Sequence, residues 1–140
     1  NDNYDLKNSH FIAALIKKIY LAKKHKKKYI EIWGTGKPKR EIIFVDDIAD
    51  ACIYFMGKKT KKTLINIGTG NDLSIESYAK NLMKFFNVRL KIKKNLKMPD
   101  GIKRKLLNVK LANSLGWKAK TNLKDGLKIT LEDLNKKNFF

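Results

Sequence analysis

The chain has 140 residues, with 32 Lys and Arg against 13 Asp and Glu and a formal net charge of +19. This length suffices for one domain with a hydrophobic core, and no run approaches the roughly 18 consecutive apolar residues of a membrane span. The single cysteine, Cys52, excludes an internal disulfide framework and a cysteine-rich metal site. We therefore expect no bound metal and a reducing, cytoplasmic setting.

The excess of positive charge has two interpretations. A strongly basic chain is typical of nucleic-acid-binding modules. However, only three of the 32 basic residues are Arg, the residue that contacts bases with two parallel hydrogen bonds. Lys, Asn and Ile share A/T-rich codons and all abound here, so we favour a composition bias. In such a chain, an Arg is expected at positions where Lys could not perform the same role. The three are Arg40, Arg89 and Arg104.

The first predicted element is a helix over residues 11–24, whose apolar residues recur at helical spacing. Asn8 or Ser9 is expected to cap it. Residues 29–33 alternate between polar and apolar like a strand. The glycines and proline of residues 34–38 then indicate a tight turn.

A second strand is expected over residues 41–45. Asp46 is then predicted to cap a helix over residues 47–56, with Gly57 as its stop. The next apolar run, residues 64–67, predicts a short buried strand.

Ser74 is expected to cap a helix over residues 75–86, and residues 89–93 alternate again as a strand. Residues 95–105 are expected to form an irregular loop and residues 109–115 a short helix. The final helix is expected over residues 123–136, with Asn122 or Thr121 as its cap. Short strands that alternate with helices indicate an α/β chain. The strands are few for so many helices, so we expect some apolar helix faces to pack on a sheet outside this chain.

The turn between Trp33 and Arg40 carries the most informative chemistry. An aromatic ring and a guanidinium on either side of a tight turn suit a nucleotide diphosphate. Two structural alternatives stay open at this point. Trp33 is equally well explained as a core residue, and Arg40 as an ion-pair partner of Glu41 or Asp46.

A histidine and an aspartate are further candidates. His10 stands just before the first helix, where a histidine is usually a surface or cap residue, but its imidazole titrates near neutrality and can deliver a proton. The turn Pro99-Asp100-Gly101 is followed by Arg104 and Lys105. Asp100 is explained either as an acceptor for sugar hydroxyls or as part of an ordinary turn.

Three other features favour structural roles. The run Gly68-Thr69-Gly70 lacks the spacing of a P-loop or a dinucleotide fingerprint, so a strand-to-loop turn is the better explanation. The pair Asp46 and Asp47 is better explained as a helix cap than as a catalytic carboxylate pair. Cys52 is expected on a buried helix face as a packing residue.

Taken together, these stretches resemble the C-terminal part of the GDP-L-fucose synthase family of extended short-chain dehydrogenase/reductases. The resemblance covers essentially the whole chain, in the family's order. The matching runs are Asn8-Ser9-His10, Trp33-Gly34-Thr35-Gly36 with Pro38 and Arg40-Glu41, Val45-Asp46-Asp47, Ile65-Asn66-Ile67-Gly68-Thr69-Gly70, Pro99-Asp100-Gly101 with Arg104-Lys105-Leu106-Leu107, and Leu115-Gly116-Trp117.

The resemblance implies an enzyme that converts GDP-4-keto-6-deoxy-D-mannose to GDP-L-fucose by 3,5-epimerisation and NADPH-dependent 4-reduction. It assigns the epimerisation acid to His10, which in the family also borders the cofactor. It assigns substrate binding to five residues: Lys18, Trp33, Arg40, Lys91 and Asp100. Where relatives carry Arg, Lys at positions 18 and 91 keeps the charge but loses the bidentate fork.

The resemblance also defines what this chain is expected to be. Residues 1–140 would form the single substrate-binding region of a truncated chain in the NAD(P)-binding Rossmann-like superfamily, with the main Rossmann sheet largely absent. The G-x-x-G-x-x-G turn, the catalytic serine, the Tyr-x-x-x-Lys pair and an epimerisation cysteine would lie upstream. We therefore expect NADPH to bind mainly outside this region and the piece alone to be inactive.

The expected partners are the GDP-sugar and, in the full-length enzyme, a second copy of the same chain; neither nucleic acid nor a membrane is expected. Two alternatives stay open. One is another nucleotide-sugar epimerase or dehydratase of the same superfamily, and the other is a basic nucleic-acid-binding module.

Overall fold

The computed structural model describes residues 2–6, 8–61 and 63–137. The chain forms two compact units. Of the described residues, unit 1 holds those up to Lys39 and Leu73–Arg104, and unit 2 holds Arg40–Asp72 and those from Lys105 to Lys137. In the described ranges, every helix is too short or too polar to cross a membrane.

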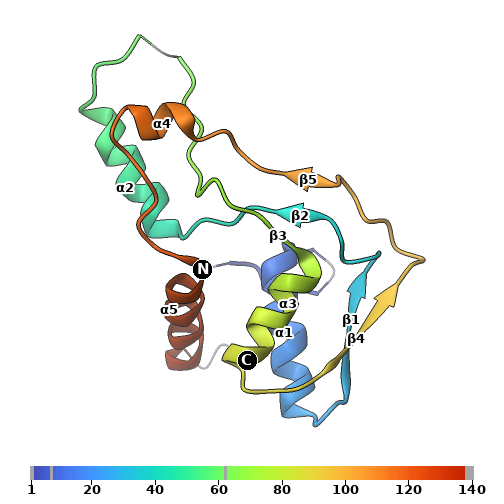
Figure 1. The fold of residues 1–140 in the computed structure, drawn as a ribbon. Helices are drawn as coiled ribbons and strands as arrows, with labels where there is room; N and C mark the ends of the chain where they lie inside the picture. The colour runs from blue at the N-terminus through green and yellow to red at the C-terminus, as the bar shows by residue number, and fades with distance from the viewer. Residues whose placement is uncertain (1, 7, 62, 138–140) are drawn as a thin grey trace. The chain divides into compact units, whose positions relative to one another are not determined.

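Unit 1 is built from two helices and a pair of parallel strands. The elements are α1 (Phe11–Lys24), β1 (Tyr29–Trp33), α3 (Ile75–Phe85) and β4 (Lys91–Asn95). Strands β1 and β4 pair in parallel, and α1 packs against both α3 and β1, as Figure 1 shows. Each strand follows a helix along the chain, so this unit repeats a helix-then-strand arrangement.

The core of unit 1 follows directly from the sequence periodicity. Helix α1 buries the residues that recur at helical spacing on one face: Ala13, Leu15, Ile16, Ile19 and Ala22. Strand β1 buries Ile30 and Ile32 and exposes its alternate residues. Trp33 belongs to the exposed set, so it does not lie in the core.

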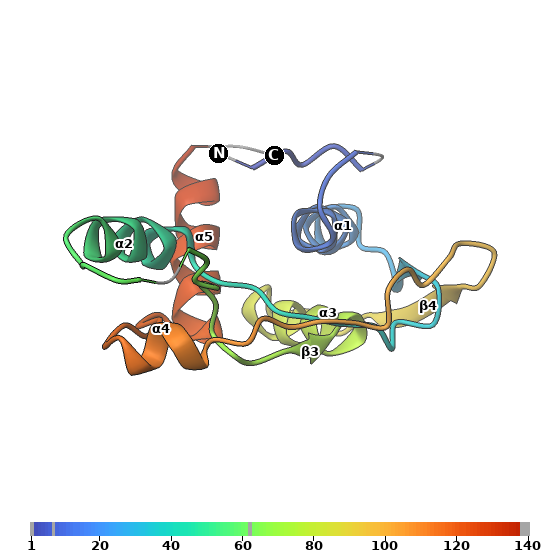
Figure 2. The ribbon, with the colours of Figure 1, turned by 90° about the horizontal axis from the view of Figure 1, so that it is seen from above.

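Unit 2 is organised around a buried tryptophan, Trp117. Its helices are α2 (Val45–Met56), α4 (Lys110–Ser114) and α5 (Leu123–Lys136). Ala51 of α2 and Ala112 of α4 pack with Trp117, and the indole N–H donates to Asp50 Oδ2 at 2.8 Å. Helices α2 and α4 lie side by side in both views (Figure 1, Figure 2). The small Ala side chains leave room for the indole between the two helices.

Three short strands form a second small sheet. They are β2 (Lys39–Arg40), β3 (Leu73–Ser74) and β5 (Arg104–Lys105), in the order β3-β2-β5. The chain passes from unit 1 to unit 2 within β2 and again within β5. In unit 2 the next residue along the chain, Glu41, donates its backbone N–H to Lys105 O at 3.1 Å.

The predicted helices and the first strand are confirmed with small shifts. The helix over 11–24 and the strand over 29–33 have the expected bounds, and the strand expected at 89–93 lies two residues later as β4. The expected caps Ser74 and Asn122 are confirmed, because each side chain accepts a hydrogen bond from the backbone N–H three residues on.

Two predicted strands are wrong. Residues 41–44 and 64–67 belong to no strand, and Val45 already begins α2. An apolar run predicts burial rather than a hydrogen-bonded neighbour, and Leu64 at the start of the second run is 75 % exposed. A strand also requires a partner at its edge, which sequence alternation cannot supply.

Three predicted local roles are wrong as well. Helix α2 starts at Val45 with Phe44 at the cap position, so Asp46 is not the cap. His10, and not Asn8 or Ser9, occupies the cap position of α1. Cys52 is exposed rather than buried.

The two aspartates at the start of α2 have different environments. Asp46 is exposed, whereas Asp47 is 4 % exposed and accepts hydrogen bonds from the backbone N–H and the hydroxyl of Thr121, at 2.9 and 3.2 Å. Both stand in the first turn, where a carboxylate is favoured by the helix dipole. Asp47 therefore joins α2 to the chain segment that leads into α5.

Candidate functional site

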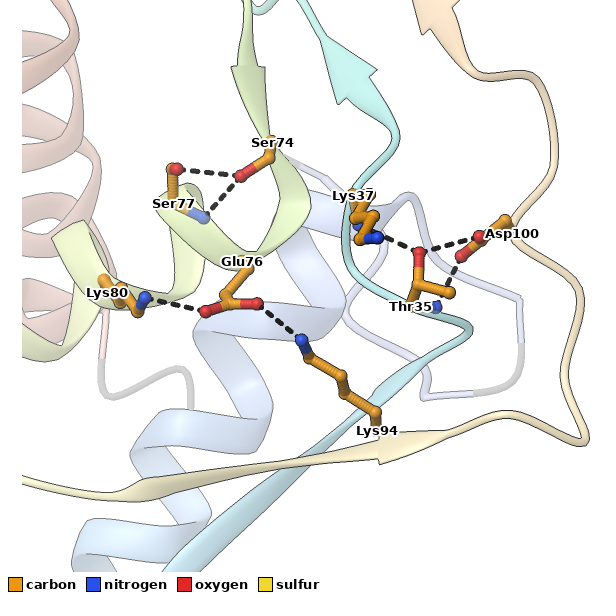
Figure 3. Close-up of polar contacts among 8 residues, drawn as sticks. All are labelled: Thr35, Lys37, Ser74, Glu76, Ser77, Lys80, Lys94 and Asp100. Atoms are coloured by element: carbon orange, nitrogen blue, oxygen red, sulfur yellow. Dashed lines mark hydrogen bonds and ion pairs between the residues drawn. The ribbon is translucent and has the colours of Figure 1, made fainter.

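The turn after Trp33 is held by a carboxylate from a distant part of unit 1. Thr35 donates its backbone N–H to Asp100 Oδ1 at 2.6 Å and its hydroxyl to Asp100 Oδ2 at 2.7 Å, as Figure 3 shows. The same hydroxyl accepts the backbone N–H of Lys37 at 3.2 Å. The hydroxyl donor, followed by the Thr35 N–H, lowers the pKa of Asp100 below its ordinary value.

Glycine is required beside this pair. Gly34 adopts a φ of +62°, which favours glycine, and a Cβ there would overlap Asp100 Oδ1. Gly36 has a φ of +72°. The two glycines bracket Thr35, so the sequence Gly34-Thr35-Gly36 presents the threonine to the aspartate.

Trp33 and Lys18, two predicted substrate contacts, lie together. Trp33 is 49 % exposed, and Lys18 Nζ lies 5.8 Å from the centroid of its ring, within the range of a cation–π contact. Lys18 Nζ also donates to the backbone carbonyl of Glu31 at 3.0 Å. Desolvation lowers the pKa of Lys18, and the nearby Glu31 charge partly opposes that shift. The ring therefore keeps an exposed surface beside a held cation.

His10 stands at the beginning of the same helix as Lys18. It occupies the cap position of α1, its side chain makes no capping hydrogen bond, and the residue is exposed. Eight residues of helix separate it from Lys18, about 12 Å along the axis. His10 is thus accessible to solvent at the start of α1.

Lys91 is not brought next to Trp33. In the parallel pair, Lys91 stands opposite Tyr29, whereas Trp33 stands opposite Asn95. Four residues of strand separate the two levels, about 13 Å. Two residues further along β4, Lys93 Nζ lies 3.6 Å from the ring centroid of Tyr29.

Arg40 belongs to unit 2, where it ends β2 and is half-buried. The next residue, Glu41, was not singled out for the site by its sequence. Its Oε1 accepts the backbone N–H of Gly70 at 2.6 Å and the hydroxyl of Thr69 at 3.2 Å, and its Oε2 accepts the backbone N–H of Leu107 at 2.9 Å. Glu41 also lines a hollow of about 420 Å³ with Ile43, Ile67, Gly68, Lys105, Leu106 and Leu107.

The Gly68-Thr69-Gly70 turn binds a carboxylate of its own chain. Gly70 has a φ of +73°, and its N–H and the Thr69 hydroxyl both point at Glu41. The prediction of a strand-to-loop turn is correct for the loop and wrong for the preceding strand. Neither Thr35 nor Glu41 carried a local signal of its role, because their partners lie 65 and up to 66 residues away.

The glycine-rich turn among the described residues does not fit the role of a cradle for NADPH. His10, the residue that the family resemblance assigns to the cofactor, has an exposed imidazole. The glycine-rich turn at residues 68–70 cannot receive a pyrophosphate in this arrangement, because its donors already bind Glu41. Among the described residues, no three His, Cys, Asp or Glu side chains gather into a metal site.

The fold and the first part of the chain define the class of protein. Residues 1–68 match the NAD dependent epimerase/dehydratase family. The solved structure of MlghC, a GDP-mannoheptose C4 reductase from Campylobacter jejuni with NADP bound, superposes with a TM-score of 0.77 and 37% sequence identity, covering 90% of this chain and 45% of that one. The chain is thus an α/β piece that matches about half of an extended short-chain dehydrogenase/reductase structure, as the sequence predicted.

Curated relatives narrow the resemblance. The chain is 36% identical over 132 residues to the putative GDP-L-fucose synthase 2 of Arabidopsis thaliana, covering 94% of this chain and 40% of that protein. It is 37% identical over 139 residues to the GDP-L-colitose synthase of Yersinia pseudotuberculosis, covering 98% of this chain and 45% of that protein. The chain therefore spans less than half the length of these relatives. Its first 68 residues match the NAD dependent epimerase/dehydratase family, and the chain is homologous to GDP-L-fucose synthases and GDP-sugar reductases.

Proposed function

We propose that residues 1–140 are the substrate-binding region of a GDP-L-fucose synthase. The parent enzyme would convert GDP-4-keto-6-deoxy-D-mannose to GDP-L-fucose with NADPH, as a homodimer in the cytoplasm. The observation that carries the proposal is the exposed Trp33 ring, with Lys18 beside it and its turn held by Asp100. This arrangement occurs in a chain whose relatives include enzymes named for GDP-sugars.

The proposed binding roles follow from the chemistry of each side chain. The Trp33 ring would stack on the nucleotide, and the Lys18 cation beside it would contact the substrate. In unit 2, Arg40 would bind a diphosphate through two parallel hydrogen bonds, the role that the family resemblance gives it. Asp100 keeps acceptor capacity beyond its two bonds from Thr35, because an ionised carboxylate has about four lone-pair sites. It can therefore accept a sugar hydroxyl while it holds the turn. Lys91 would attract the negatively charged GDP-sugar through its positive charge, without direct contact.

The proposed chemistry assigns one proton transfer to this region. The C4 ketone of the substrate acidifies the C–H groups at C3 and C5, so a base can remove a proton from one face and an acid can return one from the other. His10 is the proposed acid, and its exposed position at the start of α1 leaves the imidazole free to approach the sugar. When bound, NADPH supplies the hydride for reduction at C4.

The test uses the full-length protein that carries these residues. In D₂O with GDP-4-keto-6-deoxy-D-mannose and NADPH, we expect deuterium at C3 and C5 and GDP-L-fucose as the product, both read by NMR. The His10→Asn variant should lose inversion at C3 and C5, because the base alone can return a deuteron only to the original face, while it binds GDP with nearly unchanged affinity. Normal inversion by His10→Asn would rule out the acid role, and failure of the wild-type protein to bind GDP would rule out the proposed function.

A second candidate is the reduction of a different GDP-sugar. The homologues named for a GDP-L-colitose synthase and a GDP-mannoheptose C4 reductase favour it. The same assay separates the two, because a reductase of another sugar would oxidise NADPH with its own substrate and leave GDP-4-keto-6-deoxy-D-mannose without deuterium at C3 and C5.

A further inference from the structure

The Glu41 carboxylate is held by two chain segments of unit 2 that are far apart in the sequence. One segment is the turn at residues 68–70, which supplies Gly70 N–H at 2.6 Å and the Thr69 hydroxyl at 3.2 Å. The other is the segment after β5, which supplies Leu107 N–H at 2.9 Å. All three groups donate, and an ionised carboxylate accepts only, so the charge and the geometry match.

The surrounding backbone is shaped for this carboxylate. A Cβ on Gly68 would lie 2.6 Å from Glu41 Oε1, so no other residue fits there without displacing Glu41. Glutamine at position 41 has one oxygen and one NH₂ group. Its NH₂ group would face a backbone N–H of Gly70 or Leu107, which would then lack an acceptor. Aspartate would fall one methylene short of the donors. The site therefore selects glutamate among the residues of similar shape.

The bonds of Glu41 fix the chain on the C-terminal side of Arg40. Glu41 is tied at its side chain by three donors and at its backbone N–H by Lys105 O, at 3.1 Å. The main chain from which the guanidinium extends is thus restrained before any ligand arrives. A preorganised group binds more tightly, because less conformational entropy is lost on binding.

We infer that Glu41 is a positioning residue for Arg40. Glu41 does not touch the ligand diphosphate; it restrains the main chain next to Arg40, and Arg40 binds the diphosphate. The inference rests on the proposed function, in which Arg40 contacts the diphosphate of a GDP-sugar. Both oxygens of Glu41 are engaged by the chain itself, so Glu41 takes no part in proton transfer.

A double-mutant cycle in the full-length protein tests the inference, with GDP as the titrated probe. We expect Arg40→Ala to weaken GDP binding by about 10- to 100-fold, the range of charge-assisted hydrogen bonds. Glu41→Gln should weaken it by about 3- to 10-fold. In the double variant, the loss should equal that of Arg40→Ala alone, because Glu41 has no effect once Arg40 is gone. A merely structural role would instead give additive losses.

Each outcome is decisive. Additive losses, or full GDP affinity in Glu41→Gln, would overturn the inference. Weakened GDP binding by Arg40→Ala would still support the proposed function in either case. Full GDP affinity in Arg40→Ala would overturn the diphosphate role of Arg40 and this inference together. If Glu41→Gln does not fold, Thr69→Val carries the cycle. It removes one of the three bonds to Glu41 together with the hydroxyl contacts to Asn71, and we expect about a 2- to 3-fold loss of GDP affinity that disappears in the Arg40→Ala background.

Discussion

Asp100 binds Thr35 with both of its carboxylate oxygens, at 2.6 and 2.7 Å, across 65 residues of chain. The pair joins two motifs that the family resemblance treats as separate substrate contacts, the Trp33 turn and the Pro99-Asp100-Gly101 turn. The carboxylate contacts Thr35 (Figure 3). Because Thr35 lies two residues after Trp33, this contact also holds the backbone next to the ring. A ligand that binds Asp100 would therefore also affect the position of the Trp33 ring, because both depend on the same turn.

The first prediction concerns the pH dependence of this pair. The pKa of Asp100 is lowered, chiefly by the Thr35 hydroxyl, so its contribution to stability is present above the unfolded-state pKa near 4 and is lost as the pH falls through the folded-state pKa. Asp100→Asn should therefore lower the melting temperature at pH 7 and lower it progressively less below about pH 4. Thermal unfolding of both proteins across this pH range measures the difference.

Thr35→Ser is the control for this experiment, because serine keeps both donors to Asp100. The melting temperature of Thr35→Ser should match that of the wild-type protein at every pH. A melting-temperature difference between wild type and Asp100→Asn that stays constant from neutral to acidic pH would show that the ionised carboxylate does not stabilise the turn.

The second prediction compares two glycines. Gly34→Ala should destabilise the protein by about 2 kcal/mol or more, because the left-handed backbone costs about 1 kcal/mol with a side chain and the new Cβ overlaps Asp100 Oδ1. Gly57, at the end of α2, has a negative φ, and a Cβ added there would meet no atom within 4 Å. Gly57→Ala should be neutral or stabilise by about 0.4–1 kcal/mol. Equal effects in urea unfolding would contradict the proposed crowding at Gly34.

The fold was predictable where the signal is local. The helical spacing of the apolar residues in α1, the alternation of β1 and the cap at Ser74 depend on neighbours within a few residues, and all three were found. The sequence does not decide the exposure of Trp33, because a tryptophan at a strand end suits a core and a surface equally. Only the packing of α1 on β1 decides which face of the strand is covered, and Trp33 lies in its exposed set.

The site was less predictable, because its contacts join distant segments. The roles of Thr35 and Glu41 depend on partners more than 25 residues away, and neither residue type is unusual where it stands. The Asp46-Asp47 pair shows the same limit. A helix start was correctly inferred, but which aspartate is buried depends on Thr121 in a segment 74 residues further on.

The third prediction separates those two aspartates. Asp47→Ala should destabilise the protein by about 1–3 kcal/mol, because it leaves the N–H and hydroxyl of Thr121 without their acceptor. Asp46→Ala removes an exposed charge of the same first turn and should cost only about 0.3–1 kcal/mol through the helix dipole. Urea unfolding at neutral pH measures both values. If the two variants lose the same stability, the Thr121 contacts contribute nothing beyond the dipole.

The fourth prediction uses the two tryptophans, which differ in burial. Trp117 is 2 % exposed and packs with Ala51 and Ala112, so Trp117→Ala should cost about 3–5 kcal/mol of stability. Trp33 is nearly half exposed, so Trp33→Ala should cost about 1 kcal/mol or less of stability and weaken GDP binding by about tenfold through the lost stacking.

Thermal unfolding and GDP titration of the same full-length preparations give both quantities for each variant. Trp33→Phe is the matched control, because it keeps an aromatic face and should retain most of the affinity for GDP. A Trp33→Ala variant that binds GDP as tightly as the wild-type protein would remove the ring from the nucleotide site. Its exposed surface beside Lys18 would then need a different ligand to explain it.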